Sequence, residues 1–127
     1  MKTIMVVEPE KALRELMLSI LADVVDLKKY NIAGVSSLED TLPSLARSYD
    51  PPCALVFVPF EANTGRGLRI AQYVKQENPM VKVVLTSAIE NLLPNAGEVG
   101  LDAVYAKQDF FPPTKLHHFL VELGIEL

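Results

Sequence analysis

Short apolar runs alternate along the chain with longer stretches in which apolar residues recur every three or four positions. The short runs predict strands, because they are rich in Val, Ile and Phe and are bounded by polar or turn-forming residues. The stretches with the longer period predict amphipathic helices. The predicted strands cover residues 3–7, 31–35, 53–58, 81–86 and 103–106.

The helix after the first strand has the clearest pattern. Pro9 is predicted to lie in its first turn, where a fixed φ and a missing N–H are tolerated. Its apolar stripe consists of Leu13, Leu16, Met17, Ile20 and Leu21. A closing helix is predicted to begin at Pro112-Pro113, with an apolar stripe that includes Leu116 and Leu120.

The helices between these two are less regular. Ser36 and Glu39 have the spacing of a capping box, which predicts the start of a second helix. A third helix is expected to open at Gly67 and to end near residue 78. Pro94 and Gly97 interrupt the next stretch, so a short or irregular fourth helix is expected there.

The strand at 53–58 is continuously apolar and does not alternate with polar residues. Such a strand is buried on both faces, as in a parallel sheet covered by helices on each side. The pattern therefore predicts an α/β fold with three layers, a doubly wound parallel sheet of five strands. No linker or repeat interrupts residues 1–127, so a single domain is expected.

Composition narrows the class of protein. The net charge is −4 and no stretch concentrates Lys or Arg beyond Lys28-Lys29, so direct nucleic-acid binding is not expected. No apolar run approaches the roughly 20 residues of a membrane span, and no signal-peptide pattern opens the chain. We therefore expect a cytoplasmic protein without a membrane contact. The single cysteine, Cys53, enters a predicted buried strand and is expected to be an inert core thiol.

Chemistry in an open parallel sheet is expected where the strands end at their carboxyl side. The first strand is followed by Glu8, Pro9 and Glu10, and the third by residues 59–61. Ser87 follows the fourth strand and Lys107 follows the fifth.

In these segments the sequence resembles the receiver domain of two-component response regulators, the chemotaxis-regulator-like family, over essentially its whole length. The segment containing Glu8 and Pro9 resembles the family's acidic pair, Thr86-Ser87-Ala88 resembles its switch segment, and Lys107 resembles its lysine. The resemblance implies a flavodoxin-like sheet with strand order 2-1-3-4-5. It also implies a role in two-component or phosphorelay signalling.

The third strand departs from the family pattern. The family's phosphoacceptor Asp lies eight residues before the Gly that opens the third helix, which here is Pro59. Proline has no nucleophile, and Pro9 replaces one carboxylate of the acidic pair. Glu8 alone, with the backbone carbonyl of Glu61, is expected to bind Mg²⁺ weakly or not at all. The resemblance thus points to a degenerate receiver, or pseudo-receiver, with no cofactor and no enzymatic activity.

Other pocket residues have two interpretations each. Lys107 is expected to pair with Glu8, and the alternative is an exposed lysine at a strand end. Ser87 is expected to cap the following segment. The family's switch aromatic corresponds to Val104 here, and Tyr105 is displaced by one residue, which places it on the other side of the strand.

The function that this resemblance implies is a protein-interaction module that works without phosphorylation. Its partner is expected to be a signalling protein or a second copy of the chain, with Phe110 or Phe111 at the interface. Two alternatives remain open. One is a receiver phosphorylated at another carboxylate, such as Glu61 or Glu10, and the other is a small-ligand sensor that uses the vacated pocket.

Overall fold

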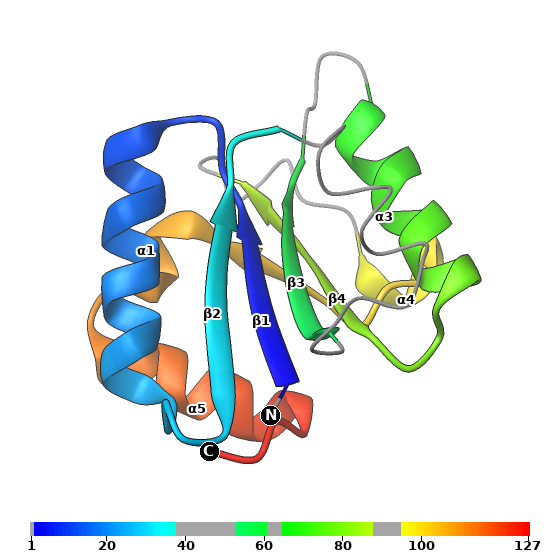
Figure 1. Ribbon diagram of the computed structural model, residues 1–127. Helices are drawn as coiled ribbons and strands as arrows, with labels where there is room; N and C mark the ends of the chain where they lie inside the picture. The colour runs from blue at the N-terminus through cyan, green and yellow to red at the C-terminus, as the bar shows by residue number, and fades with distance from the viewer. Residues whose placement is uncertain (1, 38–52, 61–64, 88–94) are drawn as a thin grey trace.

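The computed structural model describes residues 2–37, 53–60, 65–87 and 95–127. Five parallel strands form one sheet in the order β2-β1-β3-β4-β5 (Figure 1). The strands are β1 (Lys2–Val7), β2 (Tyr30–Val35), β3 (Cys53–Pro59), β4 (Lys82–Ser87) and β5 (Ala103–Ala106). The predicted fold class and strand order are therefore confirmed.

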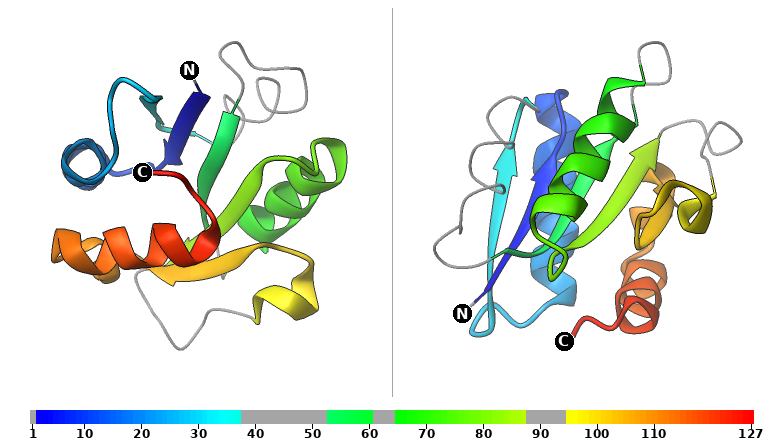
Figure 2. Two further views of the ribbon diagram at one scale, coloured as in Figure 1. Left: turned by 90° about the horizontal axis from the view of Figure 1, so that it is seen from below. Right: turned by 90° about the vertical axis from the view of Figure 1, so that its right-hand side faces the viewer.

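The helices flank the sheet on both faces (Figure 2). They are α1 (Lys11–Val24), α3 (Arg66–Glu77), α4 (Ala96–Val99) and α5 (Pro113–Leu123), and a 3₁₀ turn, η2 (Lys107–Phe110), follows β5. The short α4 agrees with the irregular helix predicted there. The capping box that was predicted to start a second helix extends into residues 38–52, which lie outside the described residues.

Alternate side chains of the central strands enter two apolar cores, one on each face. Ile4 and Phe57 pack with Met17 of α1 and Leu116 of α5. On the opposite face, Met5 and Val56 belong to the same core as Ala71 and Val74 of α3. Burial of both faces explains why the sequence of β3 is continuously apolar.

The start of α1 differs from the prediction. Pro9 does not lie in the first turn, because α1 begins at Lys11 and Glu10 is its N-cap residue, with extended backbone angles. The backbone N–H of Glu10 donates a hydrogen bond to Oε2 of Glu8 at 3.0 Å. The Glu8 carboxylate therefore holds a turn that delays the helix by two residues.

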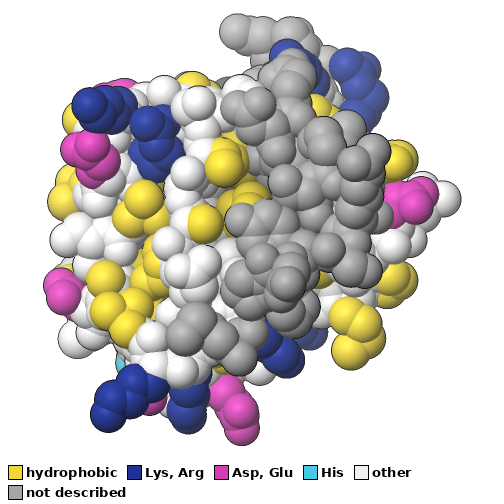
Figure 3. Space-filling model, viewed as in Figure 1, with side chains coloured by type: hydrophobic (Ala, Val, Ile, Leu, Met, Phe, Trp, Pro, Cys, Tyr) yellow, Lys and Arg dark blue, Asp and Glu magenta, His cyan; other side chains and the backbone are white. Residues whose placement is uncertain are grey.

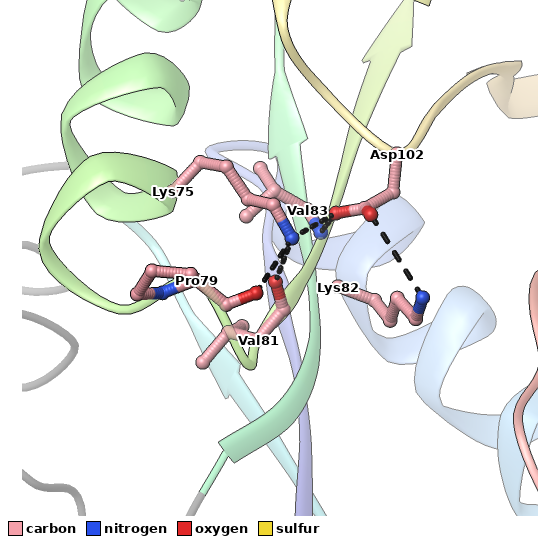
Figure 4. Close-up of polar contacts among 6 residues, drawn as sticks. All are labelled: Lys75, Pro79, Val81, Lys82, Val83 and Asp102. Carbon is pink, nitrogen blue, oxygen red and sulfur yellow. Dashed lines mark hydrogen bonds and ion pairs between the residues drawn. The ribbon is translucent and has the colours of Figure 1, made fainter.

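The edge strand β5 has charged residues on both sides. Asp102 precedes it, and its Oδ2 lies 2.9 Å from Nζ of Lys75 in α3 and accepts a hydrogen bond from the backbone N–H of Val83 at 2.8 Å (Figure 4). The Lys75 ammonium also donates to the carbonyl oxygens of Pro79 and Val81. Asp102 and Lys75 thus connect the end of α3 to the start of β5.

Candidate functional site

Glu8 directly follows β1 and is the one charged side chain that is buried in the described part of the chain, at 3% exposure. Its backbone N–H donates to the carbonyl of Val35, which continues the pairing with β2. Nη1 of Arg14, one helical turn into α1, donates to the Glu8 carbonyl at 2.8 Å. The carboxylate is thus positioned by contacts with both β2 and α1.

Lys107 directly follows β5 and reaches back to Glu8. Its Nζ lies 2.5 Å from Oε1 of Glu8, and its side chain is only 16% exposed. The predicted pairing is confirmed, and the alternative of an exposed lysine is wrong. Oε2 accepts the N–H of Glu10, whereas Oε1 has the Lys107 ammonium as its ion-pair partner and no hydrogen bond among the described residues.

Pro59 is the last residue of β3 and is buried beside Thr86 of β4. Adjacent residues of a strand direct their N–H groups to opposite neighbours. Phe60 donates its N–H to the Thr86 carbonyl of β4, so the nitrogen of Pro59 faces β1. The pairing of β1 with β3 ends at Val6 and Phe57, and Pro59 has no N–H with which to extend it.

The end of β4 supplies two buried hydroxyl groups. Thr86 is fully buried and donates its hydroxyl to the Val58 carbonyl at 3.4 Å, and Ser87 is 8% exposed and pairs with Ala106 of β5. Ser87 was predicted to cap the segment that follows it, and that segment lies outside the described residues at its start. Glu61 also lies outside the described residues. Four of the predicted site residues thus lie together at the carboxyl ends of neighbouring strands. Pro59 and Ser87 end β3 and β4, and Glu8 and Lys107 directly follow β1 and β5. Pro9, in contrast, is exposed.

The described residues do not fit a magnesium ion. Mg²⁺ requires near-octahedral oxygen ligation, usually with carboxylates that are free to coordinate it. At this edge Pro9 and Pro59 offer no carboxylate, and the oxygens of Glu8 already bind an ammonium and an amide. Across the described ranges, no cluster of three His, Cys, Asp or Glu side chains could hold a metal. Weak Mg²⁺ binding by the whole chain stays a prediction.

An aromatic cluster lies beneath the site. The ring of Phe110 lies 5.1 Å from that of Phe57 and 5.7 Å from that of Tyr105, both edge to face. Phe110 is fully buried, so the prediction of an interface there is wrong, because η2 turns this ring into the core. Phe111 is 36% exposed, and its place in an interface stays a prediction.

Tyr105 is fixed in this cluster. Its ring stacks on Phe119 of α5 at 4.0 Å, and its hydroxyl donates to the backbone carbonyl of Asp109. Burial, with a contribution from the Asp109 charge, raises the pKa of Tyr105 to about 12. Val104 packs on the opposite face of the sheet. The displacement of the aromatic to the other side of β5 is therefore confirmed.

Sequence reasoning missed two contacts of the site. Arg14 is not part of the apolar stripe of the first helix, yet it donates to the Glu8 carbonyl. Glu10 follows the Pro9 that was predicted to open the helix, yet it is the N-cap residue and donates its N–H to the Glu8 carboxylate. The signal available in the sequence was the six-residue separation of Glu8 and Arg14, which places a long cation within reach of a strand end.

A scan against protein-family models finds no match, and a search of curated proteins finds no similar sequence. Solved structures do match. A LuxR family DNA-binding response regulator from Silicibacter pomeroyi has a TM-score of 0.74 at 20% identity, over 98% of this chain and 94% of that one. The response regulator protein TrrA from Thermotoga maritima, in complex with Mg²⁺ and BeF, has a TM-score of 0.73 at 24% identity, over 97% and 99%.

The chain has the receiver fold. A CheY-like receiver domain protein from Methanospirillum hungatei matches with a TM-score of 0.73 at 15% identity, over 98% of this chain and 94% of that one. TrrA also matches in its complex with the histidine kinase ThkA, at a TM-score of 0.74 and 23% identity, over 97% and 98%. None of the helices in the described ranges is both long and apolar enough to cross a membrane.

Proposed function

We propose that the chain is a receiver-type signalling module of the cytoplasm that works through protein contacts and is not phosphorylated at the usual position. It is not an enzyme in this proposal and needs no metal. The observation that carries the proposal is the ion pair between Glu8 and Lys107 beside a proline at the end of β3.

Phosphoryl transfer to a carboxylate needs a nucleophilic oxygen in line with the phosphorus and a cation that neutralises the transferred oxygens. Pro59 occupies the end of the central strand, where the resemblance places that nucleophile. Lys107 binds Glu8 at 2.5 Å, so its positive charge is already compensated. These features favour one fixed arrangement of the site and an output that depends on surfaces.

The direct test is incubation of the chain with acetyl phosphate and Mg²⁺, followed by intact mass measurement. We expect no gain of a phosphoryl group. A stoichiometric gain that hydroxylamine removes would indicate an acyl phosphate and would restore the alternative of another carboxylate acceptor, such as Glu61 or Glu10.

A pair of variants makes the test sharper. The double variant Pro9→Asp, Pro59→Asp returns two carboxylates to the site beside Glu8, and we expect it to take up phosphoryl groups when Mg²⁺ is present. The matched variant Pro9→Asn, Pro59→Asn has nearly the same shape without the charge and should remain unmodified. Uptake by both variants, or by the native chain, would argue against the proposal.

The interaction role is tested at Phe111, which directly follows η2 and is more exposed than Phe110. If the chain forms a dimer through this surface, Phe111→Ala should shift the association measured by sedimentation toward the monomer. Phe111→Leu, which keeps an apolar side chain, is the matched control. Unchanged association in Phe111→Ala would remove Phe111 from the interface.

A further inference from the structure

A cavity of about 530 Å³ lies at the amino ends of β1, β3 and β4, which is the opposite edge of the sheet from Glu8 and Lys107. Its volume falls within the range of roughly 300–1,000 Å³ that is typical of small-ligand sites. Its lining includes Lys2, Tyr30, Met80, Lys82, Ile125 and Glu126. They come from distant parts of the sequence, so only the fold brings them together.

The two lysines give the cavity an excess of positive charge. In the part of the chain that the structure describes, no carboxylate lies within ion-pairing distance of the Lys2 ammonium. Lys82 is 41% exposed, and its Nζ lies 3.9 Å from Oδ1 of Asp102. Asp102 is already paired more closely with Lys75 (Figure 4), so the charge of Lys82 is only partly compensated.

Further cations extend this edge. A neighbouring cavity of about 430 Å³ shares Lys2, Tyr30 and Glu126 and adds Lys28 and Lys29. In Figure 3 dark-blue Lys and Arg side chains lie along the lower edge of the molecule, where the strands begin, with an acidic side chain among them, and others lie at its upper edge. The sequence separates these lysines, so its net charge of −4 does not reveal their grouping. Glu126 is the acidic residue that lines both cavities.

The remaining lining is apolar or weakly polar. Met80, which lines the cavity, is 87% exposed, and Ile125 and Cys53 line it as well although each is only 8% exposed. Burial raises the pKa of Cys53 to about 11, so this thiol stays protonated at neutral pH and is a poor nucleophile. The lining is thus suited to reversible binding of a ligand that has both an apolar part and a negative charge.

We propose that the cavity at the amino edge of the sheet binds a small organic anion, with its charged group at Lys2 and Lys82 and its apolar part against Met80 and Ile125. This site is separate from the Glu8 and Lys107 pair and does not depend on the function proposed above. A carboxylate, a sulfonate or a phosphate ester shares the required chemistry.

The test uses anilinonaphthalene sulfonate as the probe, because it combines an aromatic body with one negative charge and its fluorescence rises on burial. We expect saturable binding to the native chain, weaker binding of the neutral analogue phenylnaphthylamine, and a loss of affinity as salt is raised. Absence of saturable binding, or equal binding of the neutral analogue, would overturn the proposal.

Variants locate the site. Lys2→Gln, Lys82→Gln should weaken binding of the probe roughly tenfold, because it removes both cations that face the sulfonate while leaving polar side chains in place. The control Lys11→Gln, Lys115→Gln changes two exposed lysines that line neither cavity and should leave binding unchanged. Glu126→Gln removes a nearby negative charge and should strengthen binding. Equal effects of the two lysine pairs, or weaker binding in Glu126→Gln, would contradict the assignment.

Competition separates the possible ligand groups. Phenyl phosphate and phenylacetate have a similar apolar ring and differ in the anionic group, so each is titrated against the bound probe. Displacement by one or both, lost in Lys2→Gln, Lys82→Gln, identifies which group the lysines prefer. Failure of both to displace the probe would show that the lysines do not select an anion. Circular dichroism of every variant checks that the fold is retained.

Discussion

Replacing Lys107 by Met removes the partner of a buried carboxylate and is the most informative perturbation of the site. The methionine retains most of the apolar length of the lysine side chain, so the change is mainly one of charge. The Glu8 side chain is only 3% exposed to solvent, and Nζ of Lys107 is the cation 2.5 Å from its Oε1. In Lys107→Met the Glu8 carboxylate would be left with the N–H of Glu10 as its described hydrogen-bond donor.

The magnitude follows from the geometry. Two unit charges at this distance attract by about 7 kcal/mol at an effective dielectric constant of about 20, and desolvation of both groups offsets much of that. When one partner is removed, the remaining buried charge costs about 3–5 kcal/mol. Glu8 can avoid this by taking up a proton, which for an ordinary glutamate costs about 4 kcal/mol at pH 7. We therefore expect Lys107→Met to lose about 3–4 kcal/mol at pH 7.

The stability lost in Lys107→Met is expected to depend on pH. Protonation of an ordinary glutamate costs only about 1 kcal/mol at pH 5, so the deficit of Lys107→Met relative to the native chain should shrink as the pH falls. Urea unfolding followed by circular dichroism at both pH values measures this. Glu8→Gln, Lys107→Met removes both charges and should recover most of the loss.

Lys115→Met is the matched control, because Lys115 pairs with Asp109 at 2.6 Å and is 56% exposed. Its loss should stay below about 1 kcal/mol. If Lys107→Met cost no more than this control, or if its deficit were the same at pH 5 and pH 7, the argument from a buried charge would be refuted.

Three further predictions test other parts of the molecule. Phe110→Ala should lose about 3–5 kcal/mol of unfolding free energy because the Phe110 ring is fully buried, whereas Phe111→Ala should lose less than about 1 kcal/mol. Urea titration of both variants compares these losses, and equal losses would be inconsistent with the difference in burial. Cys53 should react with Ellman's reagent at pH 8 far more slowly than free cysteine does, because burial raises the pKa of its thiol to about 11. The reaction rate should increase as the pH is raised toward that value, and a rate at pH 8 like that of free cysteine would contradict the burial. Lys75→Met should lose about 1–3 kcal/mol because it leaves Asp102 and two carbonyl groups short of a donor, and a thermal midpoint equal to that of Lys11→Met would speak against this.

The architecture could be predicted from the sequence because a strand that is buried on both faces of the sheet has a continuously apolar sequence. The bounds of β5 agree with the prediction, and β1 begins one residue earlier than predicted, at Lys2. The contact of Lys107 with Glu8 was also predictable, since parallel strands bring both residues to one edge. These features depend on apolar periodicity and strand direction, which a single sequence contains.

Other features depend on contacts between distant residues. Phe110 and Phe111 are adjacent and equally apolar, and only the turn of η2 decides that the first is buried. Likewise, Lys75 and Asp102 are neighbours only because the end of α3 lies beside the start of β5. Local pattern does not contain such choices, so the sequence alone could not have distinguished them.

The charged residues on either side of β5 have a consequence for its alignment in the sheet. A strand at the rim bonds to one neighbour only and is prone to slip or to recruit another molecule's strand. Here Asp102 is bonded to α3 before the strand, and Lys107 is bonded to the end of β1 after it. A slide of β5 by one residue in either direction would have to separate oppositely charged groups at both ends. The four residues of β5 are thereby held in alignment by ion pairs with α3 and with the residue that follows β1, in addition to their bonds to β4, and this disfavours mispairing at the rim of the sheet.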